Sequence, residues 1–91
     1  MYELSTGVRS TRNVDGGIVL DIDHGVMFRL NPVGALILEC LGKGCAEHEI
    51  AQEIAGQYQV SEARAVADMR EFLRSLEEHK LVRTRQAESI S

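Results

Sequence analysis

The residues of this chain that could bind a metal ion are two cysteines and a histidine close together. Cys40, Cys45 and His48 are separated by four and two residues. Thiolate and imidazole groups are the usual ligands of structural zinc, but such sites take four ligands in tetrahedral geometry. The remaining histidines, His24 and His79, lie far away in the sequence. We therefore predict no metal site, and two cysteines are too few for a disulfide scaffold, so we expect free thiols.

Acid–base chemistry would need titratable groups that share a pocket. Asp21, Asp23 and His24 lie within four residues of one another, directly before Gly25. Alternation along a strand places Asp21 and Asp23 on one solvated face, and a residue before glycine is typical of a turn. Paired carboxylates without a pocket do not form an acid–base site. We therefore predict no catalytic residue and no cofactor, and we expect a protein that is not an enzyme.

Composition restricts the class of function further. The 91 residues carry 14 acidic and 10 basic side chains, which gives a net charge of −4. A dedicated nucleic-acid binder, or a protein that binds an acidic membrane surface, would need a basic surface. No apolar run approaches the roughly 18 residues of a membrane span, and the N-terminus lacks the pattern of a secretory signal. We expect one small domain, located in the cytoplasm.

Alternating apolar and polar residues predict three short strands in the first third of the chain. The first strand spans residues 8–14 and ends at Asp15-Gly16-Gly17, whose glycines suit a tight turn. In the second strand, alternation predicts that Ile18, Leu20 and Ile22 form the apolar face and contact a helix.

The third strand, residues 26–30, is expected at an edge of the sheet, with one neighbour only. An exposed edge that carries Val26, Met27 and Phe28 is a liability unless another segment pairs with it. Hydrogen-bonding direction alternates along a strand, so Met27 and Arg29 share one direction while Val26, Phe28 and Leu30 share the other. The sequence does not assign which set faces outward.

Three helices are expected to follow the strands. Asn31-Pro32 is typical of a helix start, and this first helix should end near Gly42. Apolar periodicity predicts a second helix over residues 47–58 and a third that begins after Ser61 and runs to about Lys80. The prediction is an α+β fold, in which a three-stranded antiparallel sheet is followed by three helices. Its outline is that of a winged helix-turn-helix.

Several short motifs resemble the PqqD-like family. They are Gly16-Gly17-Ile18-Val19-Leu20, the turn with Gly25, Leu30-Asn31-Pro32-Val33-Gly34-Ala35-Leu36, Ala67-Asp68 and Phe72-Leu73. That family includes coenzyme PQQ synthesis protein D and the peptide-recognition domains of ribosomal peptide natural-product pathways. The third of these motifs is most similar to the small leader-binding proteins of lasso peptide pathways. The resemblance covers residues 9–82, which leaves residues 1–8 as an N-terminal segment and residues 83–91 as a flexible tail.

The resemblance implies a non-catalytic protein that binds the leader segment of a precursor peptide and presents it to a modifying enzyme such as a leader peptidase. The leader would add as an antiparallel strand to residues 26–30, in a groove bordered by the third helix. The site residues are then Val26, Met27, Phe28, Arg29, Leu30, Ala65, Asp68, Met69 and Phe72. One margin of the third helix carries Asp68 and His79 and the other carries Arg70 and Glu77, and the sequence does not show which margin faces the groove.

Two positions depart from the family pattern. Leu38 stands where relatives often have an aromatic residue in the first helix. Lys80 stands where many relatives have glycine near the end of the third helix. No glycine therefore marks the end of that helix.

The alternative function is that of a winged-helix DNA-binding regulator, with the third helix in the major groove. Charge argues against this alternative. Residues 62–80 contain four basic and five acidic side chains, and residues 47–58 contain three glutamates and neither lysine nor arginine. Such helices would make poor contacts with phosphates.

Overall fold

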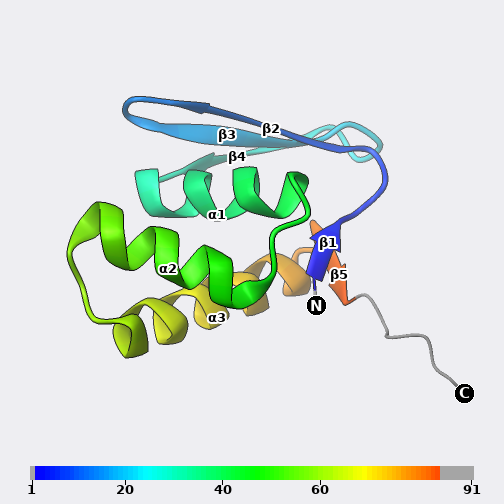
Figure 1. Ribbon diagram of the computed structural model, residues 1–91. Coiled ribbons are helices and arrows are strands. Elements are labelled where there is room, and N and C mark those ends of the chain that lie inside the picture. The colour runs from blue at the N-terminus through cyan, green and yellow to red at the C-terminus, as the bar shows by residue number, and fades with distance from the viewer. Residues whose placement is uncertain (1, 85–91) are drawn as a thin grey trace, which may run out of the picture.

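The computed structural model describes residues 2–84 (Figure 1). Its elements, in chain order, are β1 (Tyr2–Leu4), β2 (Val8–Asn13), β3 (Gly16–Asp21), β4 (Val26–Leu30), α1 (Pro32–Gly42), α2 (Glu47–Tyr58), α3 (Glu62–Glu78) and β5 (Val82–Thr84). Strands β2, β3 and β4 form an antiparallel meander, and the helices follow it in sequence. The predicted α+β fold is therefore confirmed for the described residues. No helix among them is long and apolar enough to cross a bilayer.

Helix α1 lies between the meander and the other two helices (Figure 1). It is apolar on nearly all sides, as a helix buried on two faces must be. Leu36, Ile37 and Leu38 are fully buried. Gly17 of β3 allows α1 to approach the sheet closely, since a Cβ atom on Gly17 would lie 3.0 Å from the Cβ of Ala35. The core is thus centred on this helix.

The inward face of β3 differs from the prediction. Val19 is completely buried, whereas Leu20 is 40% exposed and Ile22 is 59% exposed. Val19 is paired with Phe28, and residues directly opposite in an antiparallel pair share a face of the sheet. Leu20 therefore points away from α1 together with Ile18. The expectation that Ile18, Leu20 and Ile22 form the core face was wrong.

The expectation that Asp21 lies on a solvated face was also wrong. Asp21 is 7% exposed, and its carboxylate has hydrogen-bond partners within the turn that follows β3. The backbone N–H of His24 donates to Oδ1 at 3.2 Å, and His24 Nδ1 lies 2.7 Å from Oδ2. Because a buried polar group with hydrogen-bond partners costs much less than one without them, Asp21 can share a face with Val19.

The ends of the helices follow local capping rules. Asn31 Oδ1 accepts the N–H of Gly34 at 2.7 Å, and Ser61 Oγ accepts the N–H of Arg64 at 3.1 Å, as predicted for the two N-caps. Helix α3 ends slightly earlier than predicted, at Glu78. Beyond it Lys80 adopts a left-handed backbone with φ of 61°. This is the conformation that glycine usually supplies at a helix C-terminus.

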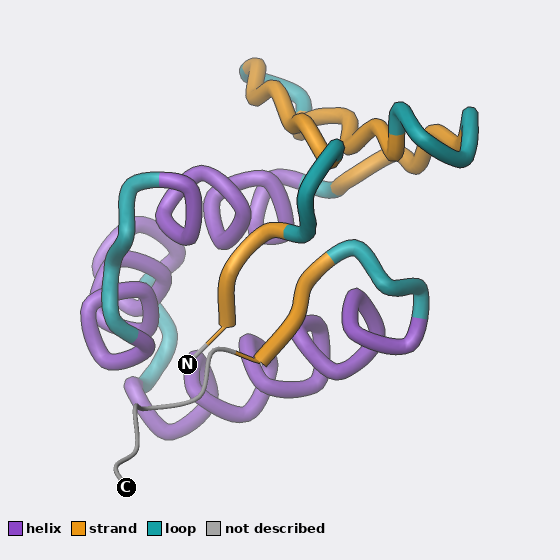
Figure 2. The backbone as a smooth tube through the Cα atoms, turned by 90° about the vertical axis from the view of Figure 1, so that its right-hand side faces the viewer, coloured by secondary structure: helices purple, strands orange, loops and turns teal. Residues whose placement is uncertain are grey.

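The two ends of the described chain pair with each other. Strands β1 and β5 lie side by side as an antiparallel pair, with Leu4 opposite Val82 (Figure 2). The N–H of Ser5 also donates to the carbonyl of Leu81 at 2.9 Å. Residues 2–4 and 82–84 are therefore paired within the described fold. The division into a segment 1–8, a domain 9–82 and a tail 83–91 stays a prediction. The rest of that predicted tail, residues 85–91, lies outside the described residues.

Candidate functional site

Strand β4 is an edge strand in the described structure, with β3 as its neighbour on one side. The direction of its backbone groups follows from the ladder. The N–H of Ile22, directly after β3, donates to the carbonyl of Gly7, directly before β2. Hydrogen-bonding direction alternates along a strand, so the backbone groups of Ile18 and Leu20 also point toward β2. Those of Gly17, Val19 and Asp21, the second set, point toward β4. Asp21 belongs to the second set and is opposite Val26. The outward N–H and C=O groups of β4 are consequently those of Met27 and Arg29.

A first cavity of about 500 Å³ lies between the start of α1 and the side of α3. Its lining residues are Asn31, Val33, Gly34, Ile37, Asp68, Glu71, Phe72 and Ser75. Ile37 is fully buried and forms part of an apolar floor with Val33 and Phe72, which are half-buried. Asp68 and Glu71 are exposed and form an acidic rim. The cavity can therefore receive a side chain that is apolar along its length.

A second cavity of about 290 Å³ lies between β4 and the end of α3. Its lining residues are Asp21, His24, Val26, Phe28, His79 and Lys80. The rings of Phe28 and His79 meet edge to face here, with centroids 5.2 Å apart. His79 Nδ1 lies 2.9 Å from the carbonyl oxygen of Ser75, which only accepts, so Nδ1 carries a proton. Nε2 is then the ring nitrogen that can interact with a ligand.

One stripe of α3 borders both cavities. Asp68, Phe72, Ser75 and His79 are spaced by four, three and four residues, which places them on one side of a helix. Arg70, on the opposite margin, forms an ion pair with α2 instead. The margin of α3 that carries Asp68 and His79 therefore faces β4. We call the surface between β4 and this stripe, with its two cavities, the groove.

The structure brings together some of the predicted site residues and separates others. Val26 and Phe28 line the second cavity, and Asp68 and Phe72 line the first. Met27 and Arg29 are exposed on the other face of the sheet and contribute their backbone groups to the edge, while Leu30 is buried at the end of β4. Their part in binding stays a prediction.

Ala65 and Met69 lie in the core rather than on the groove. Their exposed fractions are 0% and 1%, so neither offers surface to a ligand. Both belong to the row of α3 that also buries Leu73 and Leu76, about 100° around the helix from Asp68. A partner that contacts α3 must therefore use the neighbouring stripe, and we omit these two residues from the site.

Ten residues that line the two cavities of the groove are not among the predicted site residues. They are Asp21, His24, Asn31, Val33, Gly34, Ile37, Glu71, Ser75, His79 and Lys80. The helical repeat holds a signal for two of them, because Ser75 and His79 continue the stripe that begins at Asp68 and Phe72.

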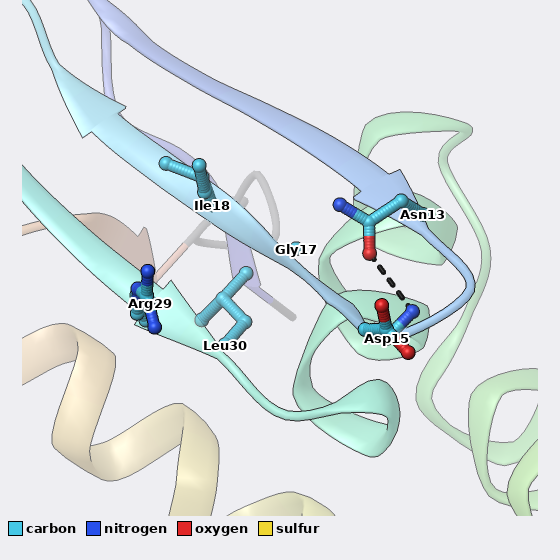
Figure 3. Close-up of a pocket in the computed structure, with 6 residues that line it drawn as sticks. All are labelled: Asn13, Asp15, Gly17, Ile18, Arg29 and Leu30. Carbon is cyan, nitrogen blue, oxygen red and sulfur yellow. Dashed lines mark hydrogen bonds between the residues drawn. The ribbon is translucent and has the colours of Figure 1, made fainter.

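A further cavity, of about 330 Å³, lies at the tip of the β2–β3 hairpin (Figure 3). It is lined by Asn13, Asp15, Gly17, Ile18, Arg29 and Leu30. Figure 3 shows the hydrogen bond that closes the hairpin, in which the N–H of Asp15 donates to Asn13 Oδ1 at 2.9 Å. Asp15 and Arg29, the charged residues, are both exposed. This cavity therefore lacks a buried polar group that could orient a ligand.

The two cysteines are free thiols. Burial raises the pKa of the Cys40 thiol to about 11. Cys40 therefore stays protonated at neutral pH, which makes it a poor nucleophile and a poor metal ligand. Within residues 2–84, no three side chains of the kinds that bind metals are grouped closely enough to hold an ion.

Comparison with known proteins identifies similar chains. The family model described as coenzyme PQQ synthesis protein D (PqqD) matches residues 16–82. The structure of TbiB1 in complex with the TbiA(beta) leader peptide is 30% identical, with a TM-score of 0.82, and the match covers 92% of this chain and 98% of that chain. A lasso peptide synthetase B1 complexed with the leader peptide is 25% identical, with a TM-score of 0.80, and the match covers 91% and 98%. None of the curated proteins compared matches the chain.

Proposed function

The chain belongs to the coenzyme PQQ synthesis protein D family, and on that premise we propose that it binds the leader segment of a ribosomally synthesised precursor peptide. Both solved structures described above are complexes with a leader peptide. We infer a non-catalytic protein that presents the bound precursor to a modifying enzyme, with the leader peptidase of a lasso peptide pathway as the expected partner. The cytoplasmic location stays a prediction.

The observation that carries this proposal is the free edge of β4 beside the groove. A peptide that adds antiparallel to β4 can pair its backbone with the outward groups of Met27 and Arg29. Its residues opposite Val26, Phe28 and Leu30 then direct their side chains to the inner face of the sheet, where the groove lies. Main-chain hydrogen bonds supply affinity in this mode of binding, and the two cavities supply specificity.

The alternative of a DNA-binding regulator receives no support from the family match or from the similar structures. The described surface agrees with this. Glu47, Glu49 and Glu53 make α2 acidic, and Arg70 of α3 is engaged with Glu47 at 3.6 Å. Neither helix offers the basic surface that phosphates require.

Proline substitutions on β4 test the proposal, because proline lacks the amide donor and is tolerated at a sheet edge where that donor faces outward. We expect Met27→Pro and Arg29→Pro to stay folded but to bind the leader about fivefold more weakly, since each hydrogen bond contributes about 1 kcal/mol. Met27→Ala and Arg29→Ala remove the same side chains and keep the amides, so they serve as matched controls. Phe28→Pro should damage the fold, because the Phe28 amide belongs to the inner ladder.

The measurements are circular dichroism for folding and fluorescence anisotropy with a labelled leader of the precursor from the same biosynthetic cluster. If a folded Met27→Pro variant binds that leader as tightly as its alanine control does, the leader does not pair with β4. The proposal of strand addition is then wrong.

A further inference from the structure

The two ends of the groove differ in charge. At the first cavity, Asp68 and Glu71 place two carboxylates on the rim. Asp68 is paired with Arg64, whose Nε lies 3.1 Å from Oδ2, while no ion pair of Glu71 is found within the described residues. Glu71 is therefore the carboxylate that is open to a ligand.

The lining of the second cavity is basic rather than acidic. Lys80 contributes an ammonium group, and His24 and His79 contribute imidazole rings. Asp21 also lines this cavity, but its carboxylate is buried and accepts from His24. Glu78 lies at the end of α3 without lining the cavity. Lys80 is thus the charged group that an incoming peptide meets at this end.

The direction of the groove orders these two charges. Helix α3 runs antiparallel to β4, because its earlier residue Asp68 lies near Asn31 and its later residue His79 lies near Phe28. A peptide that adds antiparallel to β4 begins at the Leu30 end and finishes at the Val26 end. Its N-terminal part therefore passes the acidic rim, and its C-terminal part passes the basic end.

From this arrangement, which rests on the proposed function, we propose that the groove selects peptides with a basic, an apolar and an acidic residue in that order at alternate positions. The basic residue, Lys or Arg, lies opposite Leu30, the apolar residue opposite Phe28, and the acidic residue opposite Val26. These positions are i, i+2 and i+4 of one strand, and the outer two are about 13 Å apart.

The first cavity fits lysine or arginine because it combines an apolar floor with an acidic rim. The aliphatic part of the side chain packs on Val33, Ile37 and Phe72, and the cationic head reaches Glu71. At the other end, a carboxylate meets Lys80 and the two imidazoles. A peptide with the same residues in reverse order would face like charges at both ends.

Selection from a phage-displayed library of random dodecapeptides tests this inference and does not require the sequence of the leader. We expect the enriched peptides to carry the basic–x–apolar–x–acidic order at least about fivefold more often than the reverse order. Selection on Glu71→Lys should remove the preference for the basic residue and keep that for the acidic one. Selection on Lys80→Glu should do the opposite. Both positions are exposed, and circular dichroism checks that the variants fold.

Binding of the enriched peptides to Met27→Pro separates the two proposals. Peptides that lose affinity for Met27→Pro, compared with Met27→Ala, but show no charge order would overturn the inference on charge and leave strand addition intact. Peptides that bind Met27→Pro and Met27→Ala equally would overturn strand addition, and so would the absence of any enriched peptide. The inference on charge would then fail with it.

Discussion

The imidazole ring of His79 stands edge-on against the phenyl ring of Phe28, with the ring centroids 5.2 Å apart and the ring planes at 69°. Phe28 is the central residue of the edge strand β4, and His79 follows the last residue of α3. Because this contact joins the two walls of the groove, it sets their separation at the end near Val26.

We expect His79→Ala to lower the free energy of unfolding by about 1 kcal/mol, since aromatic pairs contribute about 0.5–1.5 kcal/mol beyond their buried area. His79→Phe should retain most of that stability, because it keeps a ring against Phe28. Urea unfolding of the single and double variants with Phe28→Leu gives the coupling energy. A coupling energy near zero would show that the two rings touch without stabilising the fold.

The inward face of β3 gives a second prediction. Val19→Ala should lower the free energy of unfolding by about 2 kcal/mol, because Val19 is buried between the sheet and α1. Leu20→Ala removes more atoms from an exposed side chain and should cost well under 1 kcal/mol. Urea denaturation compares the two variants. The opposite ranking would mean that β3 presents its other face to the core.

This face of β3 also shows where sequence reasoning stops. The three strands of the meander, the two N-caps and the helices follow from local signals such as Asn31-Pro32 and Ser61, and the structure confirms them. The exception is the first turn, because Gly16 and Gly17 lie in β3 and not in the turn as predicted. Local signals do not show which face of β3 turns toward the core, because Ile18, Val19 and Leu20 are all apolar and offer no contrast between the two faces. The charge of Asp21 favours a solvent-facing position in the prediction, and only the structure shows the contact with His24 that allows Asp21 to be buried.

The same limit applies to contacts between distant segments. Tyr2–Leu4 and Val82–Thr84 are three-residue strands that are separated by almost the whole chain, so neither has a local pattern that identifies its partner. On α3, Met69 and Phe72 are both apolar and lie on adjacent rows. Packing against the other helices buries Met69 and leaves Phe72 half-buried in the groove, and side-chain type alone does not separate them.

A third prediction concerns the contact between α1 and α3 at the first cavity. A Cβ atom on Gly34 would lie 2.9 Å from Cζ of Phe72, so Gly34→Ala must displace the phenyl ring. The alanine improves helix propensity by up to about 1 kcal/mol, which offsets the crowding, so we expect little change in stability. Leader affinity, measured by fluorescence anisotropy, should fall severalfold because the ring moves into the groove. The double variant with Phe72→Leu should recover part of that affinity, and unchanged binding of Gly34→Ala would exclude Phe72 from the site.

A fourth prediction uses the buried thiol of Cys40, whose pKa burial raises from 9.0 to about 11. In the unfolded chain the thiol loses its proton near pH 9, whereas in the folded protein it keeps the proton up to about pH 11. The folded state therefore binds more protons in this range, and stability must fall as pH rises from about 9 to about 11, by about 3 kcal/mol. Urea unfolding between pH 8 and pH 11 should show this decline in the wild type and a smaller decline in Cys40→Ala. Parallel curves for the two proteins would contradict the shift.

The last prediction concerns Lys80, which occupies a left-handed backbone conformation with φ of 61°. This conformation is strained for a residue with a side chain, so Lys80→Gly should stabilise the fold by about 0.5–1 kcal/mol and raise the Tm by roughly 3–6 °C. Lys80→Ala keeps the strain and should give no such gain. Gln59, with φ of 57° at the end of α2, is the matched position, since Gln59→Gly relieves similar strain far from the groove.

The two glycine variants should differ in peptide binding. Both are expected to raise the Tm in scanning calorimetry, but Lys80→Gly also removes the cation from the second cavity. Affinity for a peptide with an acidic residue opposite Val26 should therefore fall about threefold in Lys80→Gly and stay unchanged in Gln59→Gly, as expected for an exposed ion pair of less than 1 kcal/mol. A gain in Tm with full affinity in Lys80→Gly would show that Lys80 serves only to end α3.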